Sequence, residues 1–192
     1  MVAVNSTMLE LGTEAPSFEL PDPAGALVAL EAVADGNPVL VVFVCNHCPY
    51  VRHIGPTFGR VADQLASMGV ATVGVNSNDI EHYPEDAPEE MAVTAERWGW
   101  RFPYLLDEEQ TVAKAYRAAC TPDLFLFDAD LRLAYRGQFD SSRPRNDLPI
   151  DGADIRMAAR AVVAGEPVPE PQVPSIGCNI KWRDGNEPDW FG

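Results

Sequence analysis

Basic residues are scarce in this sequence. It contains 14 Lys and Arg against 29 Asp and Glu, which gives a formal net charge of −15 at pH 7. A field of this sign repels phosphate backbones and acidic lipid headgroups, so we expect neither nucleic acid nor a membrane surface as a partner. No Lys or Arg precedes Arg52. Since a secretory signal begins with basic residues, the sequence predicts a cytoplasmic protein.

Long hydrophobic runs, cysteines and nucleotide-binding motifs are also few or missing. No apolar run approaches the ~18 residues of a membrane-spanning helix. Four cysteines in 192 residues are too few for a disulfide-stapled scaffold, whereas 46% hydrophobic residues suffice for one domain with its own core. No strand pattern is followed by G-x-G-x-x-G, so we expect no cofactor, and electrons must come from a partner protein or a small thiol.

Apolar patterns of strand and helix type alternate along the chain. Residues 39–44 and 70–76 are continuous apolar runs, which are typical of strands buried on both faces. A helical stripe fills residues 49–68 between them. Gly55 and Pro56 lie inside this stripe, and we expect them to bend the helix or delay its regular start.

Turn and capping signals define the remaining elements. Two strand patterns within 17–30 flank a turn rich in Pro and Gly and predict a β-hairpin. Capping-box spacings at 86–89 and 107–110 each open a helix. A strand pair within 124–135 and a helix over 153–164 follow. This order predicts an α/β fold with a mixed central β-sheet flanked by helices, an N-terminal β-hairpin and an inserted β-α unit.

The last part of the chain has a different composition. Residues 1–165 carry the strand and helix patterns and form one domain, whereas 166–192 is Pro-rich and favours an extended path. A disordered tail is one interpretation of this extension. The other is a docked segment, because four apolar side chains would share one face of an extended chain, namely Ile176, Cys178, Ile180 and Trp182. We expect the extension to dock on the domain.

The motif Cys45-Asn46-His47-Cys48 lies where a buried strand ends and a helix begins. A helix N-terminus favours an anion and lowers the pKa of a thiol from about 8.5 to about 3.5–7.5. The spacing puts both sulfurs on one face, where they can close a disulfide, and an imidazolium at His47 favours the thiolate of Cys45. We expect Cys45 to be the nucleophile because it lies nearest the helix start and solvent. Cys48, the more buried thiol, is the expected resolving residue.

Other interpretations of this motif stay open. A lone C-x-x-C can be half of a zinc site or a pair of inert buried thiols. Cys120 and Cys178 are single and far from the motif, so no second close pair completes a structural zinc site, and we expect no metal. His53 and His82 have no recognisable ligand partners. The position of the C-x-x-C between strand and helix in an α/β pattern favours a redox dithiol.

Several longer motifs resemble a known family. Residues 43–51, 83–86, 135–137 and 175–182 are similar to the peroxiredoxin-like, AhpC/TSA-related redoxins of bacteria that carry a CNHC active-site motif. The order of the elements, with Thr121-Pro122 opening the terminal hairpin, resembles the thioredoxin fold. The resemblance covers nearly the whole chain. It implies a thioredoxin-like fold and a thiol-specific, antioxidant type of protein without naming a physiological substrate.

The resemblance also implies roles for Thr121 and Pro122. In that fold, Pro122 is a cis proline that lies against the C-x-x-C, and the backbone of Thr121 is presented to an extended substrate. True peroxiredoxins have Pro-x-x-x-Thr-x-x-Cys at their peroxide site, but counting back from Cys45 gives Pro38 and then Val42 in place of the threonine. Their arginine is also missing at 120–123. The sequence thus favours dithiol chemistry over a complete peroxide pocket.

Three functions remain under consideration. The first is a thiol–disulfide oxidoreductase in which Cys45 attacks, Cys48 resolves and His47 tunes Cys45. Its partners would be protein or small-molecule thiols and disulfides, with a reducing partner protein. The second is a thiol-dependent peroxidase, in which Cys45 attacks a hydroperoxide. The third is a metal- or protein-binding module without catalysis.

Two further cysteines are candidates for additional redox thiols. Cys120 lies two residues before Pro122, so we expect it within reach of the dithiol, although a small buried residue at the sheet edge explains it equally well. Cys178 is either a buried structural thiol or a second resolving thiol that exchanges with the dithiol when the extension moves.

Overall fold

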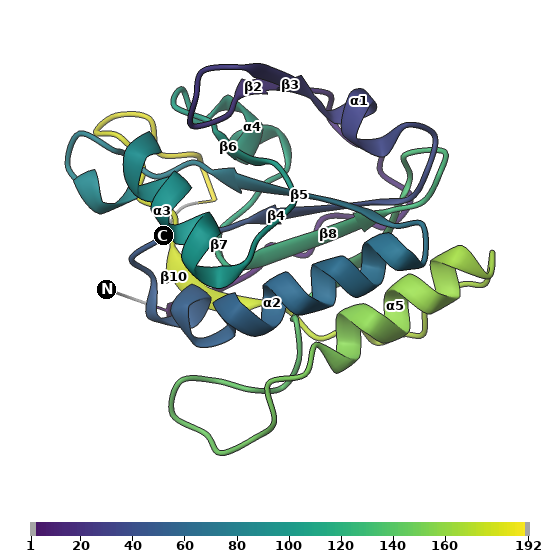
Figure 1. Ribbon diagram of the computed structural model, residues 1–192. Coiled ribbons are helices and arrows are strands. Elements are labelled where there is room, and N and C mark those ends of the chain that lie inside the picture. The colour runs from purple at the N-terminus through teal and green to yellow at the C-terminus, as the bar shows by residue number, and fades with distance from the viewer. Residues whose placement is uncertain (1–2, 191–192) are drawn as a thin grey trace.

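A five-stranded mixed β-sheet forms the centre of the molecule in the computed structural model, which describes residues 3–190 (Figure 1). Its strand order is β6-β5-β4-β8-β9. The strands are β4 (Val39–Phe43), β5 (Ala71–Asn76), β6 (Tyr104–Leu106), β8 (Asp123–Phe127) and β9 (Leu133–Gly137). β4, β5 and β6 are parallel, and β8 and β9 add antiparallel pairs. The predicted α/β fold with a mixed sheet is confirmed.

Helices cover both faces of this sheet. They are α1 (Leu30–Ala34), α2 (Pro49–Ser67), α3 (Pro88–Trp98), α4 (Thr111–Ala115) and α5 (Ala153–Val163). Leu40 and Val42 of β4 pack into a core with α2 and α5, whereas Val39, Val41 and Phe43 pack into a second core with α1 and α4. The apolar run over 39–44 is continuous because each face of β4 has its own core. No helix in the described part of the chain is long and apolar enough to span a bilayer.

The N-terminal hairpin consists of β2 (Glu19–Pro21) and β3 (Leu27–Ala29), which pair antiparallel as predicted. α2 runs without interruption through Pro56, so the expected delay of its regular start is not found. The helix predicted after 107–110 is short and ends at Ala115, because Arg117 adopts a left-handed conformation with φ 50°.

The capping-box prediction at 86–89 is wrong in one respect. The N-cap of α3 is Ala87, and Asp86 belongs to the preceding 3-10 turn η1 (Pro84–Asp86). The side chain of Asp86 points away from α3 and hydrogen-bonds the backbone N–H of Asn46, at 2.7 Å. The carboxylate of Asp86 could either cap α3 or bond the motif loop, and it bonds the motif loop.

The C-terminal extension adds a strand to a second, three-stranded sheet. Its order is β1-β10-β7, with β1 (Ala3–Asn5), β7 (Cys120–Thr121) and β10 (Ile176–Asn179). The extension therefore lies against the body, and it passes behind the N-terminal end of α2 (Figure 1). The division of the chain at residue 165 stays a prediction.

The expectation of one shared apolar face on the extension is wrong. Cys178 packs into the core beneath α2, whereas Ile180 and Trp182 pack into the core on the other face of the sheet. The strand β10 ends at Asn179, so the extended alternation on which the expectation depended stops before Ile180.

Candidate active site

The C-x-x-C motif occupies the loop between β4 and α2, as the sequence predicts. Cys48 is the N-cap of α2, and Cys45 lies three residues earlier. Both are reduced and buried, with 1% and 0% of their surfaces exposed. The expected contrast, with Cys45 nearer to solvent and to the helix start, is therefore wrong. The reason is that the helix begins after Cys48 rather than at Cys45.

Thr121 and Pro122 lie against the two thiols. The Thr121–Pro122 peptide bond is cis, as the resemblance implies. The hydroxyl Oγ1 of Thr121 is 3.4 Å from Cys45 Sγ, and the Cys48 thiol donates to the carbonyl oxygen of Thr121 at 3.1 Å. One residue of the opposite loop thus contacts both sulfurs of the motif.

The protonation preferences of the two thiols differ in the direction opposite to the prediction. Burial raises the pKa of the Cys45 thiol, and the neighbouring Cys48 and Asp86 raise it further. The neighbouring thiols of Cys178 and Cys45 lower the pKa of Cys48. Of the two motif thiols, Cys48 is therefore the one whose surroundings favour loss of the proton.

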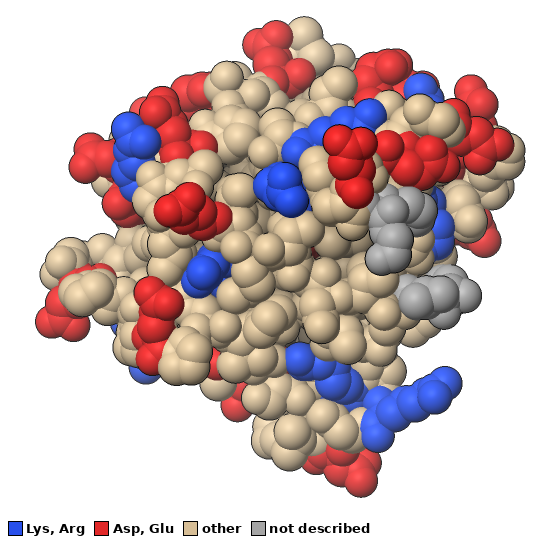
Figure 2. All heavy atoms as spheres, turned by 180° about the vertical axis from the view of Figure 1, so that it is seen from behind, with Lys and Arg blue, Asp and Glu red and all other residues tan. Residues whose placement is uncertain are grey.

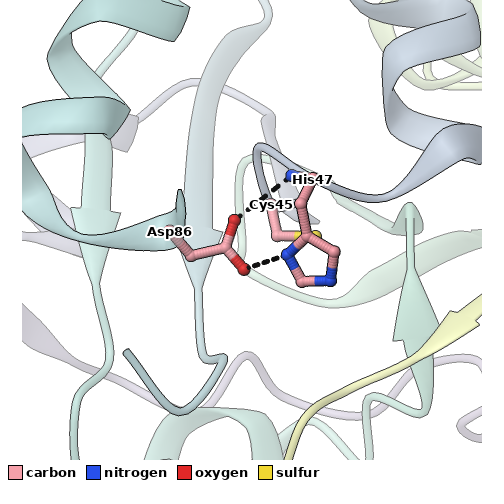
Figure 3. Close-up of side chains that lie close together, drawn as sticks. All are labelled: Cys45, His47 and Asp86. Carbon is pink, nitrogen blue, oxygen red and sulfur yellow. Dashed lines mark hydrogen bonds and ion pairs between the residues drawn. The ribbon is translucent and has the colours of Figure 1, made fainter. Parts of the chain in front are cut away.

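Asp86 holds His47 beside Cys45 (Figure 3). Its carboxylate is completely buried and lies 2.7 Å from His47 Nδ1. It also accepts hydrogen bonds from the backbone N–H of His47 at 3.3 Å and from the amide of Asn78 at 2.7 Å. Within residues 3–190, the other ring nitrogen of His47, Nε2, is buried without a hydrogen-bond partner. The carboxylate fixes the ring and leaves Nε2 able to accept a proton.

The loop between the cysteines is fixed by residues that the sequence analysis missed. The side chain of Asn46 donates to the carbonyl of Glu85 at 2.9 Å and accepts from the hydroxyl of Tyr104 at 3.1 Å. Arg52 donates to the carbonyl of Asn46 at 2.8 Å. The similarity of residues 83–86 to the redoxin family was the one sequence signal for Asp86. Tyr104 and Arg52 left no such signal.

One cluster in the described residues has the composition of a metal site. The ligand atoms of Cys45, His47 and Asp86 lie within 4.8 Å of one another. Sulfur, imidazole and carboxylate are ligands that suit zinc, and three protein ligands leave a fourth position open. The expectation that this protein holds no metal stays a prediction.

The two remaining cysteines lie close to the dithiol. Cys178 pairs with Thr121 across the β10–β7 ladder, and Asn179 pairs with Cys120. Cys178 and Cys48 are close enough for each to shift the pKa of the other. Cys120 is completely buried, and burial raises the pKa of its thiol. Of the two candidates, Cys178 is the one that contacts a sulfur of the motif directly.

The other histidines have partners of their own. His53 Nε2 lies 3.1 Å from the hydroxyl of Ser142, and His82 Nδ1 lies 2.5 Å from the carboxylate of Asp79. The hydrogen bond and charge of Asp79 raise the pKa of His82.

Beside the motif loop, a groove of about 680 Å³ is lined by Asn46, Arg52, Pro84, Glu85, Glu90, Thr94, Arg97 and Trp98.

Comparisons with known proteins show the family and the fold. The AhpC/TSA family matches residues 11–136. A crystal structure of an uncharacterized conserved protein from Geobacillus kaustophilus is 52% identical, with a TM-score of 0.92, and the match covers 95% of this chain and 97% of that one. A hypothetical protein from Sinorhizobium meliloti is 47% identical, with a TM-score of 0.92, and the match covers 94% and 99%.

A more distant structure shares the fold. The peroxidoxin BcpB from Mycobacterium tuberculosis is 22% identical with a TM-score of 0.60, and the match covers 81% of this chain and 97% of that one. No curated protein matches the sequence.

Proposed function

This chain belongs to the AhpC/TSA family, whose members carry out redox chemistry at thiols, and on that basis we propose that it is a thiol–disulfide oxidoreductase. Its redox couple would be Cys45 and Cys48. The observation that carries the proposal is the contact of both sulfurs with one residue, Thr121, beside a carboxylate-held imidazole. A pair of inert buried cysteines would not require the His47–Asp86 pair.

We assign the first attack to Cys45. Because burial raises its pKa, Cys45 requires a base, and Nε2 of His47 is available to accept the proton. The thiolate of Cys45 attacks one sulfur of a substrate disulfide, forms a mixed disulfide and releases the other sulfur as a thiolate. The hydroxyl of Thr121, 3.4 Å from Cys45 Sγ, would orient the substrate sulfur.

We assign the second attack to Cys48. Its low pKa provides a thiolate without a base, and this thiolate attacks Cys45 Sγ of the mixed disulfide. The substrate leaves as a second thiol, and the two electrons that it has gained come from the Cys45–Cys48 dithiol, which is oxidised to a disulfide. A sulfenic acid substrate would follow the same path, with water as the leaving group.

Trapping of the mixed disulfide tests these roles. The Cys48→Ser variant incubated with a disulfide-containing peptide should accumulate a peptide adduct on Cys45, detectable by non-reducing mass spectrometry. The Cys120→Ser variant, which keeps both motif cysteines, should turn over without trapping. If instead the Cys45→Ser variant traps the peptide on Cys48 faster, the two roles are reversed.

A thiol-dependent peroxidase is the second candidate, and membership of the AhpC/TSA family favours it. In that reaction Cys45 would attack a hydroperoxide, release water or an alcohol, and become a sulfenic acid that Cys48 resolves. The hydroxyl of Thr121, 3.4 Å from Cys45 Sγ, is a donor for the peroxide oxygen. Stopped-flow reaction with hydrogen peroxide separates the candidates, because a dedicated peroxidase should far exceed the rate of a free thiol.

A binding module without catalysis remains the third alternative, and the zinc content of the purified protein tests it. Stoichiometric zinc bound through Cys45, His47 and Asp86 would replace the redox proposal. We also propose that the protein works in the cytoplasm, because no Lys or Arg precedes Arg52 to form the basic start of a secretory signal. Cell fractionation tests the location.

A further inference from the structure

The C-terminal extension carries a third thiol to the dithiol. Cys178 of β10 is the register partner of Thr121, whose carbonyl oxygen is 3.1 Å from Cys48 Sγ. Both Cys178 and Cys45 are close enough to Cys48 to lower the pKa of its thiol. Cys48 therefore has two neighbouring thiols with which it could form a disulfide.

Cys178 also borders a surface groove that the two motif cysteines do not line. This groove has a volume of about 380 Å³. Its lining residues are Ala3, Pro49, Tyr50, Arg143, Pro144, Arg145 and Cys178. Cys178 is thus the thiol that a molecule in this groove would meet.

The groove is basic on an otherwise acidic protein. Its lining includes two arginines and no carboxylate side chain, although the chain as a whole has a net charge of −15. Figure 2 shows Lys and Arg side chains gathered at the lower edge of the molecule, where the loop between β9 and α5 lies in Figure 1. Guanidinium groups bind carboxylates with two parallel hydrogen bonds, so an anionic ligand matches this groove.

We propose that Cys178 is the residue through which the oxidised protein is reduced again. The reductant would be a small thiol that carries carboxylates and binds in the groove beside Arg145. The inference rests on the proposed function of the Cys45–Cys48 couple. The volume of the groove suits a small molecule, since ligand sites typically measure about 300–1,000 Å³.

The steps balance as ordinary thiol–disulfide exchange. The thiolate of Cys178 attacks Cys48 Sγ of the Cys45–Cys48 disulfide, and Cys45 leaves as a thiolate that takes up the proton from Cys178. A small thiolate then attacks Cys178 Sγ and releases Cys48. A second small thiol attacks this mixed disulfide, so that two small thiols become one small disulfide and Cys178 is reduced again.

Disulfide mapping tests the Cys48–Cys178 step independently of any activity at Cys45. The Cys45→Ser variant, oxidised with diamide, should form a Cys48–Cys178 disulfide, and the Cys45→Ser/Cys178→Ser double variant should form none. Formation of Cys48–Cys120 instead, or a Cys48 that stays reduced, would overturn the proposal. Failure of the proposed function, by contrast, would appear as absent peptide trapping on Cys45 while this disulfide still forms.

The reductant is tested with two thiols of different charge. Oxidised protein should be reduced about tenfold more slowly by glutathione in the Arg145→Gln variant, whereas reduction by neutral 2-mercaptoethanol should stay unchanged. Arg145 is the residue to replace because it is exposed, whereas Arg143 also donates to Asp140 and Gln138. Exposed Arg160 at the end of α5 provides the matched control, Arg160→Gln. Equal effects on both thiols, or none, contradict an anionic reductant in this groove.

Discussion

Asp86 connects several parts of the site from a completely buried position. Its two carboxylate oxygens accept hydrogen bonds from the backbone N–H of Asn46, from the amide of Asn78 and from His47. A buried carboxylate is strongly unfavourable unless it is hydrogen-bonded, and here each partner belongs to a different segment or to the motif loop itself. Asp86 is therefore a positioning residue for His47 and, through it, for Cys45.

Replacing Asp86 by Asn should slow the attack of Cys45. The imidazole would lose the anion that fixes its orientation, so we expect at least about a tenfold lower rate of peptide trapping in the Cys48→Ser background. The rate profile should move to lower pH, because the charge of Asp86 raises the pKa of the Cys45 thiol. Glu85→Gln is the matched control, because Glu85 is the exposed neighbour in the same turn. A trapping rate and pH profile identical to those of the parent would refute a role for Asp86 in the chemistry.

Asp123 gives the stability of the protein a pH dependence. Burial raises the pKa of this completely buried carboxyl to about 7, from 3.8. Because the folded state binds the proton more tightly than the unfolded state, the stabilisation is complete below pH ~4 and is lost as the pH rises to ~7. The loss over this window is on the order of a few kcal/mol.

The Asp123→Asn variant should lack this pH-dependent loss. Urea unfolding at several pH values between 4 and 8 measures it as the difference in free energy of unfolding between wild type and variant. We expect the wild type to lose stability relative to the variant as the pH rises through this range. A constant difference would show that Asp123 titrates normally in the folded protein.

The sequence predicted the site residues that belong to local motifs and missed those that act across the fold. Cys45, Cys48, His47 and the Thr121–Pro122 pair could be named because a four-residue motif and a family resemblance carry them. Asp86 is 39 residues from His47, and such a contact leaves no periodic pattern. The lowered pKa of Cys48 depends on the neighbouring thiols of Cys178 and Cys45, and a helix start alone does not predict this contribution.

Among the elements, β10 is the one that brings Cys178 to the dithiol. Its register places Cys178 opposite Thr121 and Asn179 opposite Cys120. Such close pairing requires glycine at position 177, because a Cβ there would lie 2.0 Å from the carbonyl oxygen of Thr121. The atoms that such a Cβ would meet belong to the backbone, so no change of side-chain rotamer could remove the clash.

Gly177→Ala should therefore displace β10 from β7. We expect destabilisation of about 1–3 kcal/mol or more, the range for inserting a methyl group into a packed site. Urea unfolding gives the free energy, and hydrogen exchange should show faster exchange of the β10 amides. Val173→Ala, at an exposed residue of the same extension, is the control. Unchanged stability and exchange would mean that this backbone approach is looser than the structure shows.

Among the strands, the sequence predicted best those whose pattern depends on burial alone. The continuous apolar runs predicted β4 and β5 correctly, because strands between two cores have no alternation to misread. The course of residues 176–182 was wrong in part, because the extended chain ends at Asn179 and the next apolar residues enter the opposite core. Strand register within a second sheet depends on partners that the local pattern does not contain.

For the molecule as a whole, the site lies where the five-stranded and three-stranded sheets meet. The loop between β4 and α2 provides Cys45 and Cys48, and β7 and β10 of the three-stranded sheet provide Thr121 and Cys178. Two grooves adjoin this junction, one beside Asn46 and one beside Cys178. A substrate and a regenerating thiol can therefore approach from different sides.

A redox titration with disulfide mapping tests the central claim most directly. The Cys178→Ser variant should be used, because it removes the thiol that we propose as the other disulfide partner of Cys48. This variant should be equilibrated in buffers of defined redox potential. We predict a single two-electron transition to a Cys45–Cys48 disulfide, with a midpoint between about −270 mV, the value of thioredoxin, and about −120 mV, that of a strong oxidant. A protein that forms no Cys45–Cys48 disulfide anywhere in this range would contradict the account.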